Sequence, residues 1–176
     1  NVDVFSAEDD RQAEIFWEDR HKLSAIAKRT SGFKVNEDIV IPLEVIPEFS
    51  DFLENMNLHY MAVAYRKALK KVTDLAGVDP ADPFIDQEFA FVKDIFKGVV
   101  TVKDLSDQEL EVQASYFFHD LRSRYPAERE ALDAILSDMQ ATRVIVANHM
   151  HAGDGNCHVN FPVNSNDPEM LGLVHE

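Results

Sequence analysis

The segment RVIVANHM (residues 143–150) leads through HAGDGN (151–156) into CHVNFPV (157–163). Apolar and polar residues alternate in the two outer pieces, which is the period of a half-buried β-strand. The Gly-Asp-Gly-Asn run between them has the turn chemistry that joins antiparallel strands. We therefore predict a β-hairpin over residues 142–164. The chain before it repeats its apolar residues every three or four positions, as helices do.

The predicted hairpin gathers four polar residues near its turn. If the turn centres on its Asp-Gly pair, His151 lies opposite His158 and His149 lies opposite Asn160. Alternation then puts these four residues on one face of the sheet. The other face collects apolar residues and the single cysteine, with Asn148 as its one polar member; the others are Val144, Val146, Met150, Cys157, Val159, Phe161 and Val163. We interpret the apolar face as core and the polar face as a candidate site.

The histidines suggest a metal site, but they do not complete one. Directly opposed strand residues have Cβ atoms about 4.5 to 5.5 Å apart, which suits two imidazoles that share one ion. A catalytic zinc needs three protein ligands, so His151 and His158 require a third, which we expect to be a carboxylate from elsewhere. The same run is also a good turn by its chemistry alone, and a histidine pair also occurs as a half-exposed stack. The residues leave both interpretations open.

The chain before the hairpin is predicted to supply one strand and a set of helices. The first helix, opened by Ser6 and closed before Gly32, carries Arg20 on its apolar stripe. Arg20 either covers that stripe with its stem while its head reaches water, or it clamps an anion. A strand is expected over residues 37–42, and further helices over 47–77, 84–98, 106–121 and 126–139.

These elements predict an α+β fold in a single domain, residues 1–176. A small antiparallel sheet, built from the strand at 37–42 and the hairpin, would pack its apolar face on helices. The order of strand, helix, strand, strand and helix matches part of a ferredoxin-like split motif. Residues 57–141 would form a helical insertion in it.

The composition excludes several classes of partner. The 176 residues include 17 Lys and Arg against 32 Asp and Glu, a net charge of −15, so nucleic acid and anionic membranes would be repelled. We see no membrane span and no signal peptide, and the one cysteine precludes an intrachain disulfide. We expect a cytoplasmic protein. Because the chain starts at Asn1 without methionine and stops within an expected helix, we also expect a fragment of a longer protein.

Two patches of sequence resemble one known family. HAGDGNCH (151–158) with the following Val-Asn is similar to a loop in the C-terminal domain of the FAD-linked oxidases. That group includes D-lactate dehydrogenase, glycolate oxidase and D-2-hydroxyglutarate dehydrogenase. FWEDR (16–20) and EDIVIP (37–42) resemble the opening helix and first strand of the same domain. The central helices lie outside the resemblance, and the segment from about residue 57 to 141 is longer than most members have.

The resemblance implies FAD-dependent oxidation of a D-2-hydroxy acid such as D-lactate or glycolate. Position by position, His151 and His158 match the family's two metal-binding histidines, and Arg20 matches an arginine that holds the substrate carboxylate. Asn36 takes the position of a lysine found in some members, so we include it among the substrate-binding residues. His149 and Asn160 would line the same pocket.

The resemblance also implies what this chain does not carry. The metal is expected to be divalent, with zinc as the first choice, and its third ligand and the general base would come from a Glu-His-Gly motif beyond Glu176. We find no glycine-rich strand–loop–helix pattern for a dinucleotide, so FAD would be held mainly by another domain of the same parent chain. This fragment alone is expected to be inactive.

Two other functions remain open at this stage. In the first, His151 and His158 hold a metal that activates water in a hydrolase. In the second, the chain is an acidic helical module for protein docking, and its hairpin has no chemistry.

Overall fold

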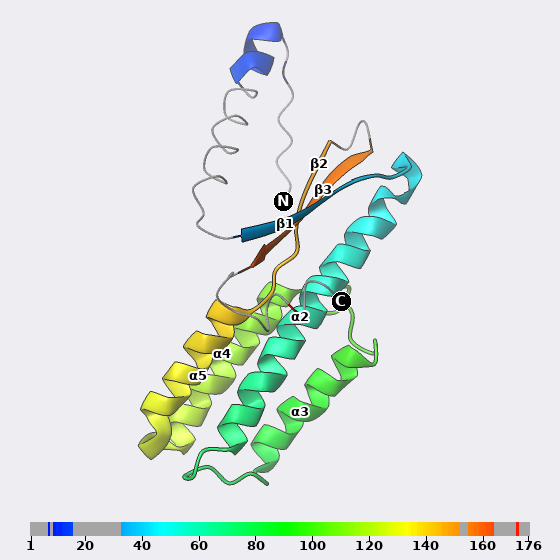
Figure 1. Ribbon diagram of the computed structural model, residues 1–176. Coiled ribbons are helices and arrows are strands. Elements are labelled where there is room, and N and C mark those ends of the chain that lie inside the picture. Colours follow the sequence, from blue (N-terminus) through cyan, green and yellow to red (C-terminus); the bar gives the residue numbers. More distant parts are fainter. Residues whose placement is uncertain (1–6, 8, 16–32, 152–154, 164–171, 173–176) are drawn as a thin grey trace. The chain divides into compact units, whose positions relative to one another are not determined.

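The computed structural model describes residues 7, 9–15, 33–151, 155–163 and 172 (Figure 1). The elements follow in the order β1 (Phe33–Val40), η1 (Leu43–Val45), α2 (Ile46–Thr73), α3 (Pro83–Phe96), α4 (Asp107–Arg124), η2 (Pro126–Glu128), α5 (Arg129–Thr142), β2 (Ala147–His151) and β3 (Asn156–Val163). Backbone contacts divide the chain into two compact units, Asn1–Phe33 and Lys34–Glu176.

In the first unit the structure describes the start of the predicted helix. Residues 10–15 are helical, and the Asp9 carboxylate accepts a hydrogen bond from the backbone N–H of Gln12 at 2.8 Å. Asp9 therefore caps this helix, whereas the sequence predicted Ser6 as the cap and Asp9 inside the first turn. Ser6 and Arg20 lie outside the described residues.

Four helices of the second unit, α2, α3, α4 and α5, form a bundle around one core (Figure 1). Helix α2 packs against each of the other three, and its second half is apolar on more than one side, as a surrounded helix must be. Three of its core positions are alanines, which allow close approach of the neighbouring helices. The largest fully buried side chains of this core are Tyr65, Phe118, Leu58, Met61, Leu69, Ile85, Leu110, Leu121 and Leu132.

Local signals explain where the bundle helices begin. Ser106 and Glu109 form the predicted capping box at the start of α4. Helix α3 starts at Pro83 behind Asp82, whose side chain accepts from the N–H of Phe84 at 3.0 Å. The same carboxylate binds the Tyr125 hydroxyl at 2.7 Å and Arg124 Nε at 2.8 Å. The hydrogen bond from Tyr125, followed by that from Phe84, holds the pKa of Asp82 below its ordinary value. Asp82 thus ties the start of α3 to the end of α4.

The three strands form one sheet in the order β1-β3-β2, so β3 lies between β1 and β2. This order is the split arrangement that the sequence predicted, and the α+β fold class is confirmed. Strand β2 begins at Ala147, not at residue 143 as predicted. The reason is that helices bind the preceding residues: Arg143 contacts Asp107 and Glu111 of α4, and Val146 is bound by α2.

Candidate functional site

One face of the sheet is buried against the first half of α2, as the alternation predicted. Val146 and Val159 pack with Leu53 in a small second core, and Ile39, Phe49, Met56 and Tyr60 adjoin it. Cys157 has the same parity as Val159 and is fully buried. The interpretation of this face as core is therefore confirmed for Val146, Cys157 and Val159. Phe161 and Val163 have the same parity, but their side chains lie outside the described part.

The predicted strand pairing was wrong because the turn lies at a different position in the chain. The structure sets His149 opposite His158, His151 opposite Asn156, and Ala147 opposite Asn160. The hairpin therefore centres one residue earlier than the Asp-Gly pair. Because the shift changes the partner of each residue by two positions, every residue keeps its face.

Gly155 gives the physical reason for this shift. It ends the turn with a φ of +67°, and its carbonyl accepts from the N–H of Ile41, just past β1, at 2.8 Å. A Cβ at Gly155 would lie 2.2 Å from the Ile41 carbonyl oxygen, so only glycine fits there. The end of the turn is thus held against the chain that leaves β1, and this long-range contact determines the register.

The opposite face of the hairpin carries the polar residues. Positions 149, 151, 158 and 160 share this face in the observed register. The side chains of His158 and Asn160 are half-buried, and Asn160 Nδ2 donates to the backbone carbonyl of His158 at 3.3 Å. Residues 151 and 158 occupy diagonal positions, for which Cα atoms are typically about 7 to 8 Å apart and long or aromatic side chains still meet. The side chains of His149 and His151 lie outside the described part.

Strand β1 adds a third element to this face. Ile39 packs against the small core, whereas Val40 is 78% exposed, so alternation along β1 gives Asn36 the parity of Val40 and of the polar face. Because β1 pairs with β3, Asn36 stands on the strand next to His158 and Asn160. Its side chain, like Arg20, is not among the described ones.

The described side chains do not by themselves complete a metal site. Within that part of the chain, no three His, Cys, Asp or Glu side chains gather closely enough to hold an ion. The observed register brings three histidine positions, 149, 151 and 158, to one face, with 149 directly opposite 158. The predicted pair, His151 and His158, would still need a third ligand.

Asn57 holds the chain just before β2, a role that the sequence did not reveal. Its amide nitrogen donates to the Val146 carbonyl at 3.0 Å, and its amide oxygen accepts from the Val146 N–H at 2.7 Å. The side chain thus binds the residue before β2 as a neighbouring strand would. A polar residue next to Met56 and near Tyr60, on a helix face that otherwise packs on the sheet, was the available signal.

Arg143 makes the second connection between bundle and sheet. Its side chain is only 10% exposed, and it donates to Glu111 at 2.6 Å and to Asp107 at 3.1 Å. It lies between α5 and β2, so the ion pairs to α4 hold the chain where it leaves the bundle. The alternation in the sequence alone predicts Arg143 within the strand, which is wrong.

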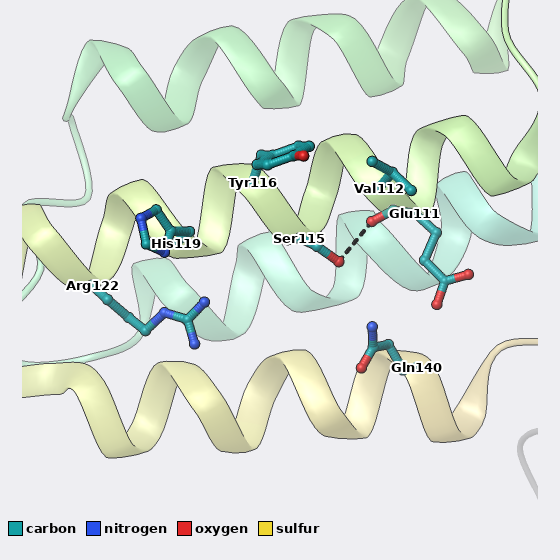
Figure 2. Close-up of a pocket in the computed structure, with 7 residues that line it drawn as sticks. All are labelled: Glu111, Val112, Ser115, Tyr116, His119, Arg122 and Gln140. Atoms are coloured by element: carbon teal, nitrogen blue, oxygen red, sulfur yellow. Dashed lines mark hydrogen bonds between the residues drawn. The ribbon is translucent and has the colours of Figure 1, made fainter.

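A groove of about 580 Å³ lies away from the sheet, on the surface of α4 and α5. Figure 2 shows Arg122 reaching from α4 toward α5 and Gln140 reaching back, with Val112 and Tyr116 on the other side of α4. Its charged groups already have partners, since Arg122 pairs with Asp133 and Glu111 pairs with Arg143. None of the predicted site residues lines this groove.

The fold and the polar sheet face define a class of protein: an α+β domain whose split sheet presents a histidine-bearing hairpin. The family described as FAD linked oxidases, C-terminal domain, matches residues 1–66 and 95–176. The chain belongs to this family, which implies an oxidoreductase that uses FAD. The unmatched residues 67–94 cover the end of α2 and most of α3.

The other comparisons add no relative. No curated protein and no solved structure matches the chain significantly. None of the helices that the structure describes is long and apolar enough to cross a bilayer.

Proposed function

We propose that this chain is the substrate-binding domain of an FAD-dependent oxidoreductase that oxidises a D-2-hydroxy acid such as D-lactate or glycolate. The observation that carries this proposal is the polar face of the hairpin, where positions 149, 151, 158 and 160 come together in a chain of the FAD-linked oxidase family. Such a face offers nitrogen donors and amide groups to a small, polar, anionic substrate. FAD would be held mainly by a separate FAD-binding domain of the same parent chain.

Each polar residue has a role in this proposal. Arg20 would bind the substrate carboxylate through a bidentate, charge-assisted contact. His149, Asn160 and Asn36 would orient the hydroxy acid from the strands on which they stand. The general base is not assigned to a residue of this chain, so we propose that the chain alone does not turn over.

His151 and His158 would hold a divalent ion, and zinc suits imidazole donors. When bound, such an ion acts as a Lewis acid toward the substrate hydroxyl. The diagonal register of positions 151 and 158 supports this use because alternation puts both positions on one face of adjacent strands. We propose that a third ligand from outside the described residues completes the metal site.

The lone, buried Cys157 suits a reducing compartment, and we propose that the protein is located in the cytoplasm.

The test is flavin reduction by defined substrates. The FAD-loaded oxidase would be mixed without oxygen with D-lactate, L-lactate, glycolate and D-2-hydroxyglutarate, and the loss of oxidised-flavin absorbance would be followed. We expect reduction by D-isomers or glycolate. His158→Ala should slow it by at least about a hundredfold and lower the bound metal, because it removes a ligand. The matched control is His119→Ala, which removes an exposed histidine from α4.

Two outcomes would reject the proposal. Hydrolysis of a generic ester without flavin reduction would favour a metal-dependent hydrolase. No metal uptake, with equal unfolding temperatures in zinc and in a chelator, would favour a docking module, since an ion that binds only the folded state must stabilise it.

A further inference from the structure

Three exposed apolar side chains lie close together in the chain where it enters α2. Leu43 is 52% exposed, Val45 is 39% exposed and Phe52 is 57% exposed, and we call these three residues the α2 entry patch. The ring of Phe52 stacks on Phe49 at a centroid distance of 6.4 Å, and Phe49 adjoins the small core under the sheet. Phe52 therefore continues an apolar contact from that core out to the surface.

The α2 entry patch adjoins the hairpin that carries the candidate site. Ile41, two residues before Leu43, binds the carbonyl of Gly155 at 2.8 Å. A Cβ placed on Gly155 would lie 3.8 Å from Leu43 Cδ2. Figure 1 shows the start of α2 beside the first residues of β3. A partner that covers the patch would thus also stand next to the histidine-bearing loop.

The segment of chain that carries the patch holds only acidic charges. Residues 37–65 contain no lysine or arginine. The acidic residues Glu44, Glu48, Asp51 and Glu54 are exposed along η1 and the first turns of α2. The patch therefore has an apolar centre flanked by carboxylates, which we call its carboxylate rim, and an apolar centre with a polar rim is the pattern of a protein interface.

We propose that the α2 entry patch docks the FAD-binding domain through an apolar surface ringed by Lys and Arg. This inference rests on the proposed function, because it names the partner of the same site. A second copy of this chain would set carboxylate rim against carboxylate rim, and like charges at close range oppose that pairing. Nucleic acid and anionic lipid meet the same repulsion. A basic-rimmed domain of the oxidase has complementary charge and stands beside the substrate loop.

The first experiment uses the unmutated, FAD-loaded oxidase. A zero-length carbodiimide cross-linker joins carboxylates to lysines in direct contact, and mass spectrometry identifies the pairs. We expect cross-links from Glu48 or Asp51 to lysines of the FAD-binding domain. No cross-link from the rim, while carboxylates elsewhere react, or rim cross-links only to a second copy, would overturn the proposal.

The second experiment measures binding of this chain to the separately produced, FAD-loaded domain by calorimetry. The double variant Leu43→Ser with Phe52→Ser should bind at least about tenfold more weakly, as loss of central apolar contacts does. Its matched control is Val112→Ser with Tyr116→Ser, which removes two exposed apolar residues of α4 and should change affinity less than about twofold. Equal affinities of the two double variants would overturn the proposal, and unfolding curves verify that both are folded.

Charge reversal supplies an independent readout. Glu48→Lys with Asp51→Lys should weaken binding at low salt and reduce its salt dependence, whereas Asp120→Lys with Glu130→Lys should not. Retained salt dependence in the rim variant would count against the basic partner surface. Flavin reduction by hydroxy acids is scored separately: docking without reduction rejects the proposed function alone, and reduction with patch-independent docking rejects this inference alone.

Discussion

The helical bundle and the sheet handle their polar residues in opposite ways. In the bundle, polar groups near the core close on one another, as in the hydrogen bond from the Tyr65 hydroxyl to Glu88 at 2.8 Å and in the Asp82 contacts with Arg124 and Tyr125. In the sheet, one face is apolar and packs on α2, while the other gathers histidine and asparagine positions beside a turn. The bundle therefore acts as scaffold, and the sheet carries the polar positions to which we assign the proposed site.

The two regions are also unequal in the size of their cores. The bundle buries a large cluster from four helices, whereas among the described residues the cluster under the sheet has three buried members, Leu53, Val146 and Val159, with Cys157 buried on the same sheet face. Helix α2 contributes to both cores, and two specific contacts of the described residues also join the regions: Asn57 binds Val146, and Arg143 binds Asp107 and Glu111. Mutations should thus separate stability from site geometry.

The largest expected effect tests whether the larger core of the bundle contributes more to stability than the small core under the sheet. Phe118 is fully buried and meets Phe117 edge-on, so Phe118→Ala should lower the free energy of unfolding by about 3 to 5 kcal/mol. Val159→Ala in the small core should cost about 1.5 to 3 kcal/mol. Urea unfolding of both variants gives the comparison. If Val159→Ala is the more damaging change, the bundle is not the main source of stability.

The second prediction compares two glycines, one in each region. Gly98 at the end of α3 and Gly155 in the hairpin have nearly the same φ, +68° and +67°, but only Gly155 has close neighbours. Gly98→Ala should cost about 1 to 2 kcal/mol for its left-handed backbone. Gly155→Ala should cost about 1 to 3 kcal/mol more, because its Cβ overlaps the Ile41 carbonyl.

The glycine pair also separates stability from the site. Gly155→Ala should move the hairpin away from Ile41 and weaken zinc uptake and substrate oxidation, whereas Gly98→Ala should leave both unchanged. Metal analysis and flavin reduction measure these effects. Equal unfolding costs for the two variants would mean that contact with Ile41 does not hold the turn.

Sequence reasoning succeeded where the determinants were local. Periodicity identified the hairpin, the face of Val159 and Cys157, and the fold class, and the Ser106 cap followed from its spacing to Glu109. The predicted strand pairing was wrong because the observed pairing depends on Ile41, which is remote in the chain from Gly155. The predicted start of β2 was wrong for a similar reason, since Asn57 binds Val146, which lies 89 positions further along the chain. Local patterns do not contain such contacts. The roles of Arg20, Asn36 and the four hairpin residues stay predictions.

The third prediction uses two asparagines of the same helix. Asn57 binds Val146 beside the sheet, and Asn55 accepts from the N–H of Val102, before α4, at 3.0 Å. Replacing either residue by alanine should cost about 1 to 2 kcal/mol, because each leaves backbone groups unpaired. Only Asn57→Ala should raise the KM for the hydroxy acid, since it alone releases β2. A similar rise in KM for Asn55→Ala would show that the effect is general loosening.

The smallest expected effect concerns a closed polar contact of the bundle. Burial raises the pKa of Glu88, and the hydrogen bond from Tyr65 only partly opposes this shift. A raised pKa means that the folded state favours the protonated carboxyl. Glu88 therefore stabilises the protein most below its unfolded pKa, and this contribution is lost as the pH rises through the folded pKa.

Glu88→Gln keeps an acceptor for the Tyr65 hydroxyl and removes the titration. Relative to wild type, the variant should gain a few tenths of a kcal/mol as the pH rises from about 4 to 8, measured as the difference between thermal unfolding curves. In Tyr65→Phe, stability should fall more steeply with rising pH than in the wild type, because the substitution deletes the hydrogen bond that lowers the Glu88 pKa. The opposite result would be that Glu88→Gln loses stability relative to wild type as the pH rises. The fold would then stabilise the Glu88 carboxylate, whereas we infer that burial of this charge is costly.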